Sequence, residues 1–173
     1  LGACVDVCHG AVMGEAPEAA FDLCEAAGIG VHRVQVSSAI AGDATPEHLQ
    51  ALQRFDEPRY LHQVVTGSAA EPRVWEDIPD FLAGDPTLPW RCHFHVPIFL
   101  QAVGALRTTQ SAIEPALRRA ARLPHAFIEV ETYAWAQLPE PAAPSIPEGI
   151  AREILHARAL LAKVGHSAQA ATR

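Results

Sequence analysis

Acidic, imidazole and amide side chains recur near the ends of four short apolar segments in this 173-residue chain. Asp, Glu and His are common protein ligands of zinc, manganese and magnesium, and imidazole favours zinc among these three metals. Burying several such groups together without a cation would cost several kcal/mol, on the order of 5. The sequence therefore predicts a divalent-metal site with these ligands: Asp6, His9, Gln35, His62, His95 and Glu131.

Period-two alternation predicts on which side of each apolar segment the polar groups lie. Histidines alternate with apolar residues in the segment 90–96, and glutamates do so in 126–133. The apolar side is suited to packing under helices, which leaves the polar side to face a site. We expect His95 and Glu131 to be catalytic. Three further residues are expected to contact substrate or support the ligands: Ser37, His93 and Glu129.

Simpler roles stay open for several of these residues. Asp6 could cap the turn that follows it, and His9 could be an ordinary loop histidine. Gln35 could satisfy backbone groups, and His62 falls in an irregular segment. No Cys-x-x-Cys pair is present, so the cysteines are interpreted as small buried apolar residues: Cys4, Cys8, Cys24 and Cys92. A role in the site stays open for Cys8 or Cys92.

The elements that position these residues alternate between strand and helix. Strands are predicted at 3–8, 31–37, 90–96 and 126–133, and helices at 17–27, 46–54, 108–122 and 148–163. Such alternation with short connections predicts an α/β fold with parallel strands and helices packed outside, in one domain over 1–163. Sites in these folds lie at the carboxyl ends of the strands. A flexible tail is predicted at 164–173.

The acidic composition narrows the range of partners. A net charge of −7 argues against nucleic acid as a partner, because phosphate binding needs clustered Lys and Arg. No apolar run reaches the length of about 18 residues typical of a membrane span, so direct membrane insertion is not expected. Free thiols without a secretory signal indicate a reducing compartment, and we expect the protein to be cytoplasmic.

Five segments in order, over about residues 1–140, resemble the bacterial metabolite-traffic protein EboE family: "DVCHGAV", "GIGVHRVQVSSAI", "PRYLHQVV", "WRCHFHVPIF" and "IEVETYAWAQLP". More broadly, "VDVCHGAV" resembles the fifth strand of the xylose-isomerase-like TIM-barrel superfamily, in which Asp and His bind metal. "IEVET" resembles its eighth strand, whose metal-binding Glu corresponds to Glu131. Gln35 stands where many members carry a metal-binding His.

This resemblance implies that the chain is the C-terminal half, about four βα units, of a (β/α)8 barrel. The first four strands would then lie upstream of Leu1. A half-barrel exposes two sheet edges, so self-association is expected. The implied function is a metal-dependent sugar-phosphate isomerase or epimerase acting on a small metabolite, with operon-encoded protein partners. Two alternatives are a non-catalytic metabolite-binding protein and a nuclease or phosphodiesterase of the endonuclease IV type, which the negative charge disfavours.

Overall fold

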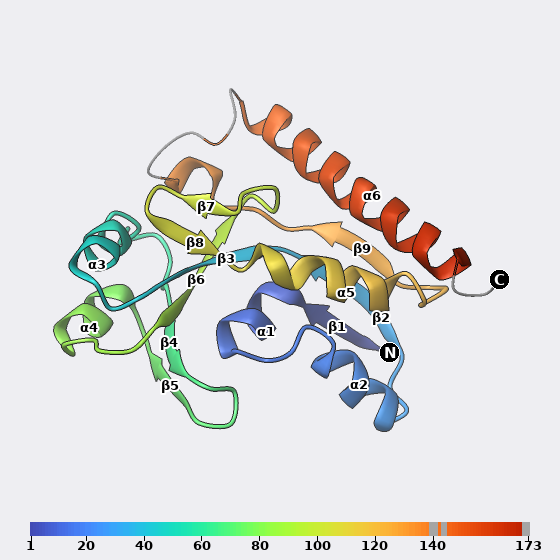
Figure 1. Cartoon of the computed structure of the whole chain (residues 1–173), viewed down its shortest axis with the longest axis horizontal. Helices are drawn as coiled ribbons and strands as arrows, with labels where there is room; N and C mark the ends of the chain where they lie inside the picture. Colours follow the sequence, from blue (N-terminus) through green and yellow to red (C-terminus); the bar gives the residue numbers. More distant parts are fainter. Residues whose placement is uncertain (139–141, 143–144, 171–173) are drawn as a thin grey trace.

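The computed structural model describes residues 1–138, 142 and 145–170, with side chains as far as Val164. Figure 1 shows two parts side by side, a small parallel sheet with the long C-terminal helix next to it and an antiparallel sheet flanked by α3 and α4. The fold class is therefore mixed α/β, as predicted from the alternation of elements.

Three of the predicted strands form the parallel sheet. They are β1 (Ala3–Asp6), β2 (Val31–Val36) and β9 (Phe127–Val130), in the order β1-β2-β9. The register pairs Asp6 with Gln35 and Gln35 with Glu129. Polar residues of all three strands therefore lie in one row on the same side of the sheet, as the alternation predicted.

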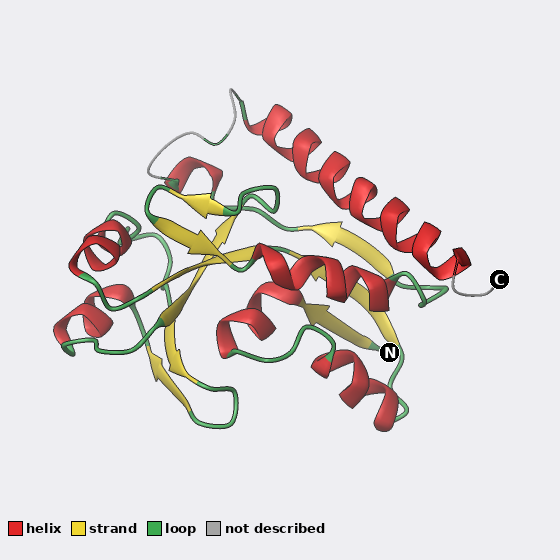
Figure 2. Ribbon diagram, in the orientation of Figure 1, coloured by secondary structure: helices red, strands yellow, loops and turns green. Residues whose placement is uncertain are grey.

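The remaining strands form a six-stranded antiparallel sheet in the order β5-β4-β6-β3-β8-β7. Its members are β3 (Ser38–Gly42), β4 (Val64–Gly67), β5 (Pro72–Trp75), β6 (Trp90–Val96), β7 (Ala102–Val103) and β8 (Leu106–Thr108). Strand β3 follows β2 after a single residue, so the chain passes directly from the parallel to the antiparallel sheet, as the path through the middle of Figure 2 shows.

The predicted third strand, β6, is present but does not lie in the parallel sheet. Its two edges are hydrogen-bonded by β3 and β4, both antiparallel to it, so no edge of β6 is left for parallel pairing. The prediction of four parallel strands is therefore wrong at β6. The sequence signal for β3 was weak, because "SAIAG" consists largely of residues that are depleted in strands.

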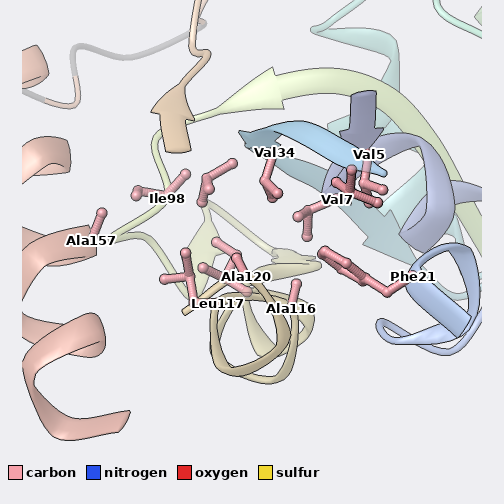
Figure 3. Packing of buried hydrophobic residues seen from close by; sticks show 12 residues of the cluster. Val5, Val7, Phe21, Val34, Ile98, Ala116, Leu117, Ala120 and Ala157 are labelled. Carbon is pink, nitrogen blue, oxygen red and sulfur yellow. The ribbon is translucent and has the colours of Figure 1, made fainter. Parts of the chain in front are cut away.

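The apolar side of the parallel sheet packs against helices. Val34 and Val36 of β2 are fully buried, and Ile113 and Leu117 of α5 (Ile113–Ala120) belong to the same core. Figure 3 shows this cluster in detail, with Phe21 of α2 (Ala19–Ala26) and Ala157 of the last helix at its sides. The prediction that one side of these strands packs under helices is confirmed.

Helix α6 (Ile146–Ala170) is the longest element and runs past the predicted helix end at residue 163. The predicted flexible tail at 164–173 thus begins within a helix, and its last residues, 171–173, lie outside the described residues. Among the helices of the described part, none combines the length and the apolar character that crossing a membrane requires.

A hydrogen-bonded cap begins helix α3 (Pro46–Gln53), since the hydroxyl of Thr45 accepts a hydrogen bond from the backbone N–H of His48 at 3.2 Å. Replacing Thr45 with alanine is expected to lower the free energy of unfolding by about 1 kcal/mol, because one N–H at the helix start loses its partner. Urea denaturation measures this change. Thr45→Ser keeps the hydroxyl and should be nearly neutral; equal losses in both variants would contradict the role of the cap.

Candidate metal centre

A short helix that the sequence prediction missed follows β1 directly. Helix α1 (Val7–Met13) begins after Asp6, whose carboxylate accepts a hydrogen bond from the backbone N–H of His9 at 3.0 Å. Gly14 ends the helix in the left-handed conformation, with φ of 76°. The predicted strand at 3–8 is thus wrong beyond Asp6, and the capping role for Asp6 is the one observed.

Helix α1 and strand β6 bring four potential ligands together. Cys8 and His9 lie in the first turns of α1, while His93 and His95 lie on one side of β6, opposite the buried Phe94. The alternation that the sequence predicted for 90–96 is therefore present. It directs both imidazoles of the strand towards α1, with His95 itself buried.

The imidazole Nε2 atoms lie in close succession. The Nε2 of His93 is 2.9 Å from the Nε2 of His9 and 3.1 Å from the Nε2 of His95. Two nitrogen ligands of one tetrahedral zinc ion lie roughly 3.3 Å apart, given Zn–N bonds of about 2.0–2.1 Å. The spacing of these nitrogens is thus close to the spacing that coordination of a common ion needs.

One group of three donors meets the geometric requirement for a metal site. The ligand atoms of Cys8, His93 and His95 all lie within 4.8 Å of one another, and Cys8 and His95 are buried. We call these three residues the Cys-His cluster. It could hold a metal ion, whereas His9 adjoins it with a side chain that is 62% exposed.

The orientation of His95 is fixed by a backbone carbonyl. Its Nδ1 lies 2.6 Å from the carbonyl oxygen of Glu131, which can only accept, so Nδ1 carries the proton. The lone pair is then on Nε2, which faces the cluster. Glu131 is itself held in place, because its N–H donates to the carbonyl of Val36 at 3.1 Å. Metal-binding histidines are typically oriented by such a partner.

Burial keeps both histidines of the strand neutral. Burial, together with the neighbouring imidazoles of His95 and His9, lowers the pKa of His93 from 6.5 to about 4. Burial likewise lowers the pKa of His95. Metal coordination needs neutral imidazole, so both rings are in the required state at neutral pH. Burial raises the pKa of the Cys8 thiol well above 9.0, so metal binding there must displace a proton.

Two carboxylates and a hydroxyl lie beside the cluster. Asp6 Oδ2 is 3.9 Å from His9 Nε2, and the buried Ser37 hydroxyl lies 3.5 Å from Asp6 Oδ1 as a donor. Burial raises the pKa of the Glu131 carboxyl, and the carboxylates of Asp6 and Glu129 raise it further. The structure thus brings Asp6, Ser37 and Glu131 to the same region as the histidines.

His62 does not join this group, although the sequence predicted it as a ligand. Its side chain is fully enclosed, with Nε2 3.0 Å from Glu57 Oε1 and Nδ1 3.3 Å from the carbonyl oxygen of His93. Its ring also packs on Phe94, with 4.8 Å between centroids. Both nitrogens already have partners, so the observed role of His62 is to fill and satisfy the core next to β6.

Two other predicted residues lie on the polar side of the parallel sheet and contact side chains outside the Cys-His cluster. The amide oxygen of Gln35 accepts a hydrogen bond from the thiol of Cys4 at 3.2 Å. Glu129 pairs with Arg33 at 3.2 Å between Arg33 Nη1 and Glu129 Oε1. Each of these two contacts joins neighbouring strands, and neither Gln35 nor Glu129 belongs to the Cys-His cluster.

Cys8 belongs to the cluster, although the sequence did not place it among the predicted ligands. It was interpreted as a buried apolar residue, and it is indeed fully buried, but its sulfur lies with two imidazole nitrogens. Asp6 and Gly14 mark the start and the end of a helix, and these two residues could have predicted that Cys8 lies on a helix next to His9. A helix beginning at Val7 puts Cys8 and His9 in adjacent positions of its first turn.

Comparisons with models of protein families, with curated proteins and with solved structures gave no match for this chain. The geometry of the cluster and the chemistry of its residues are therefore the basis on which a function is argued.

Proposed function

We propose that the chain binds a divalent metal ion at the Cys-His cluster and acts with it on a small sugar-like or polyol metabolite, as an isomerase or epimerase. The observation that supports this proposal most directly is the convergence of Cys8, His93 and His95 within 4.8 Å. Two of these donors come from a strand and one from a helix far away in the sequence. Such a meeting of ligands from separate elements is typical of metal sites.

Zinc is the metal we propose, ahead of manganese and magnesium. Thiolate and imidazole are preferred zinc ligands, whereas magnesium and manganese prefer oxygen. Three protein ligands with a fourth position left for water or substrate are typical of catalytic zinc, while four protein ligands are typical of structural zinc. The group of three found among the described residues fits the catalytic type.

In this proposal each residue around the cluster has a separate role. The metal would act as a Lewis acid on a carbonyl or hydroxyl oxygen of the metabolite. Glu131 would move a proton between neighbouring carbon atoms, since burial and nearby carboxylates raise its pKa towards the range useful for acid–base catalysis. His95 would hold the metal, oriented by its hydrogen bond to the Glu131 carbonyl. Asp6 would hold His9 in place through the first turn of α1.

The family, the origin of the fold, the cellular location and the partners are also proposals. We propose membership of the EboE family, a half-barrel origin of the fold, a cytoplasmic location and operon-encoded partners. Three parallel strands with polar residues at their carboxyl ends support the barrel origin, whereas the antiparallel placement of β6 departs from it. Self-association is supported by exposed apolar side chains on α6, at Ile150, Ile154 and Leu155.

A second candidate function is a metal-binding protein that carries a metabolite without converting it. His9 favours this candidate, because its Nε2 is 2.9 Å from that of His93. A small rotation of this exposed side chain could add a fourth protein ligand and close the site. Turnover of aldoses, ketoses or polyols by the zinc-loaded protein would favour the enzyme, and binding without turnover would favour the carrier.

Metal content tests both candidates. Protein stripped with a chelator and titrated with zinc is expected to take up about one ion per chain and to keep it through dialysis. Manganese and magnesium should bind far more weakly, because the cluster offers sulfur and nitrogen donors. Elemental analysis after gel filtration measures the ratio. A protein that retains no metal would end the proposal.

A further inference from the structure

Two tyrosines continue the wall of the metal centre beyond His95. The ring of Tyr133 packs against the His95 imidazole, with 4.6 Å between centroids and 45° between planes. Tyr60 meets Tyr133 edge to face, at 5.2 Å and 69°. His95, Tyr133 and Tyr60 therefore form a continuous row of rings that leads outwards from the Cys-His cluster.

Both tyrosines of this row are partly exposed to solvent. Tyr133 is 42% exposed and Tyr60 is 37% exposed. Within the part of the chain that the structure describes, neither phenol hydroxyl has a hydrogen-bond partner. Core tyrosines normally bury the ring and satisfy the hydroxyl. The row thus offers apolar ring surface and free hydroxyl groups beside a set of metal ligands.

Tyr133 also brings a hydrogen-bond donor to this wall. A phenol hydroxyl can donate as well as accept a hydrogen bond. Because the Tyr133 ring packs directly on His95, a ligand held at the cluster would lie beside the Tyr133 side chain.

We propose that Tyr60 and Tyr133 form a stacking wall for the ring of a cyclic metabolite whose oxygen atoms are held at the Cys-His cluster. This inference rests on the proposed function and narrows its substrate class to compounds with a ring beside a pair of metal-chelating oxygens. Aromatic faces attract the C–H groups of a saturated ring and also the edge of an aromatic ring. An open-chain metabolite would leave the wall uncovered.

Zinc-chelating hydroxamates of different shape test the wall without knowledge of the natural substrate. Acetohydroxamate has no ring, cyclohexanecarbohydroxamate has a saturated ring, and benzohydroxamate has an aromatic ring. Calorimetric titration of zinc-loaded protein is expected to show about three- to tenfold tighter binding for a ring-bearing chelator than for acetohydroxamate. Whichever ring binds more tightly identifies the preferred kind of metabolite.

Variants at Tyr60 separate stacking from effects on the metal, since no hydrogen bond or ring contact in the described part of the chain joins Tyr60 to Cys8, His93 or His95. Tyr60→Ala should abolish the preference for a ring and leave acetohydroxamate binding and zinc content unchanged. Tyr60→Phe should retain the preference. Equal affinity of all three chelators for the wild-type protein, or an undiminished preference in Tyr60→Ala, would overturn the stacking wall. Loss of all hydroxamate binding together with an absence of retained zinc would instead show that the metal site itself is wrong.

Discussion

Replacing His93 with alanine is expected to weaken zinc binding by at least about 100-fold. His93 stands between His9 and His95, with its Nε2 within 2.9 and 3.1 Å of theirs. Removing a residue that only orients a metal ligand already lowers metal affinity 10- to 100-fold. Removing a central ligand should lower the affinity at least as much. Competition with a chromophoric zinc chelator measures the dissociation constant directly.

The same substitution should remove most of the thermal stabilisation by zinc. At a free zinc concentration of about 100 times the wild-type dissociation constant, binding adds about 2.7 kcal/mol to the stability of the folded state. A variant that binds 100-fold more weakly gains only about 0.4 kcal/mol at that concentration. For a chain of this size the difference corresponds to a melting temperature lower by roughly 5–9 °C.

Metal-free protein and a distant histidine provide the controls. Without zinc, His93→Gln should melt close to the wild type, since glutamine preserves much of the side-chain volume. His125→Ala should bind zinc like the wild type, because His125 is exposed and lies outside the cluster. If His93→Ala and His125→Ala bind zinc equally well, the Cys-His cluster is not the metal site.

The alternation of side chains could be predicted from the sequence because it depends only on local geometry. Val34 and Val36 alternate with Gln35, and the structure buries both valines while Gln35 stays on the polar side. The same rule placed His93 and His95 on one side of β6. A period of two is fixed by the backbone of a strand, whichever partner that strand pairs with.

The pairing partner of β6 could not be predicted in the same way. A strand pairs with an unpaired strand edge that the fold brings next to it. For β6 one such edge belongs to β3, a segment of small residues with little strand propensity. The consequence for the site is direct. Because β6 lies against α1 and not between β2 and β9, its histidines meet Cys8 and His9 in place of Gln35.

Apolar residues recur at helical spacing along α6, but only part of that pattern is buried. Ala157 belongs to the core and Leu160 and Leu161 pack against it, whereas Ile150, Ile154 and Leu155 are 41–63% exposed. The side that packs carries Ala157 and, one turn earlier, Glu153, which is 1% exposed. Hydrophobicity alone favours isoleucine over glutamate for burial. Glu153 is buried because its hydrogen-bond partners lie there, and these partners are far away in the sequence.

Glu153 fixes α6 to the ends of two strands through a single oxygen. Its Oε1 accepts hydrogen bonds from the backbone N–H of Ile98 at 3.0 Å and from the hydroxyl of Thr132 at 2.6 Å. Ile98 follows β6 and Thr132 follows β9, next to Glu131. The carboxylate therefore connects the helix to the segments that carry His95 and the Glu131 carbonyl.

Glu153→Ala is expected to lower the free energy of unfolding by about 2–3 kcal/mol, because it deletes two hydrogen bonds and leaves the Ile98 N–H buried without an acceptor. Glu148→Ala on the same helix is the matched control and should change stability by less than about 0.5 kcal/mol, since Glu148 is exposed. Chemical denaturation of the three proteins measures both effects. A loss in Glu148→Ala as large as that in Glu153→Ala would contradict the anchoring role.

Glu153→Gln distinguishes the charge from the hydrogen bonds, because glutamine keeps an oxygen that can accept from both donors. Burial raises the pKa of Glu153 in the folded state, whereas the unfolded chain keeps the usual value of about 4.3. Between these two pKa values the folded state binds more protons than the unfolded state, so the wild type loses stability as the pH rises through that window. Glu153→Gln has no such group and should therefore gain stability relative to the wild type as the pH rises from about 4 through the raised pKa of Glu153. Denaturation curves at several pH values measure this difference, and a difference that is constant or changes in the opposite direction would show that the buried carboxyl does not have a raised pKa.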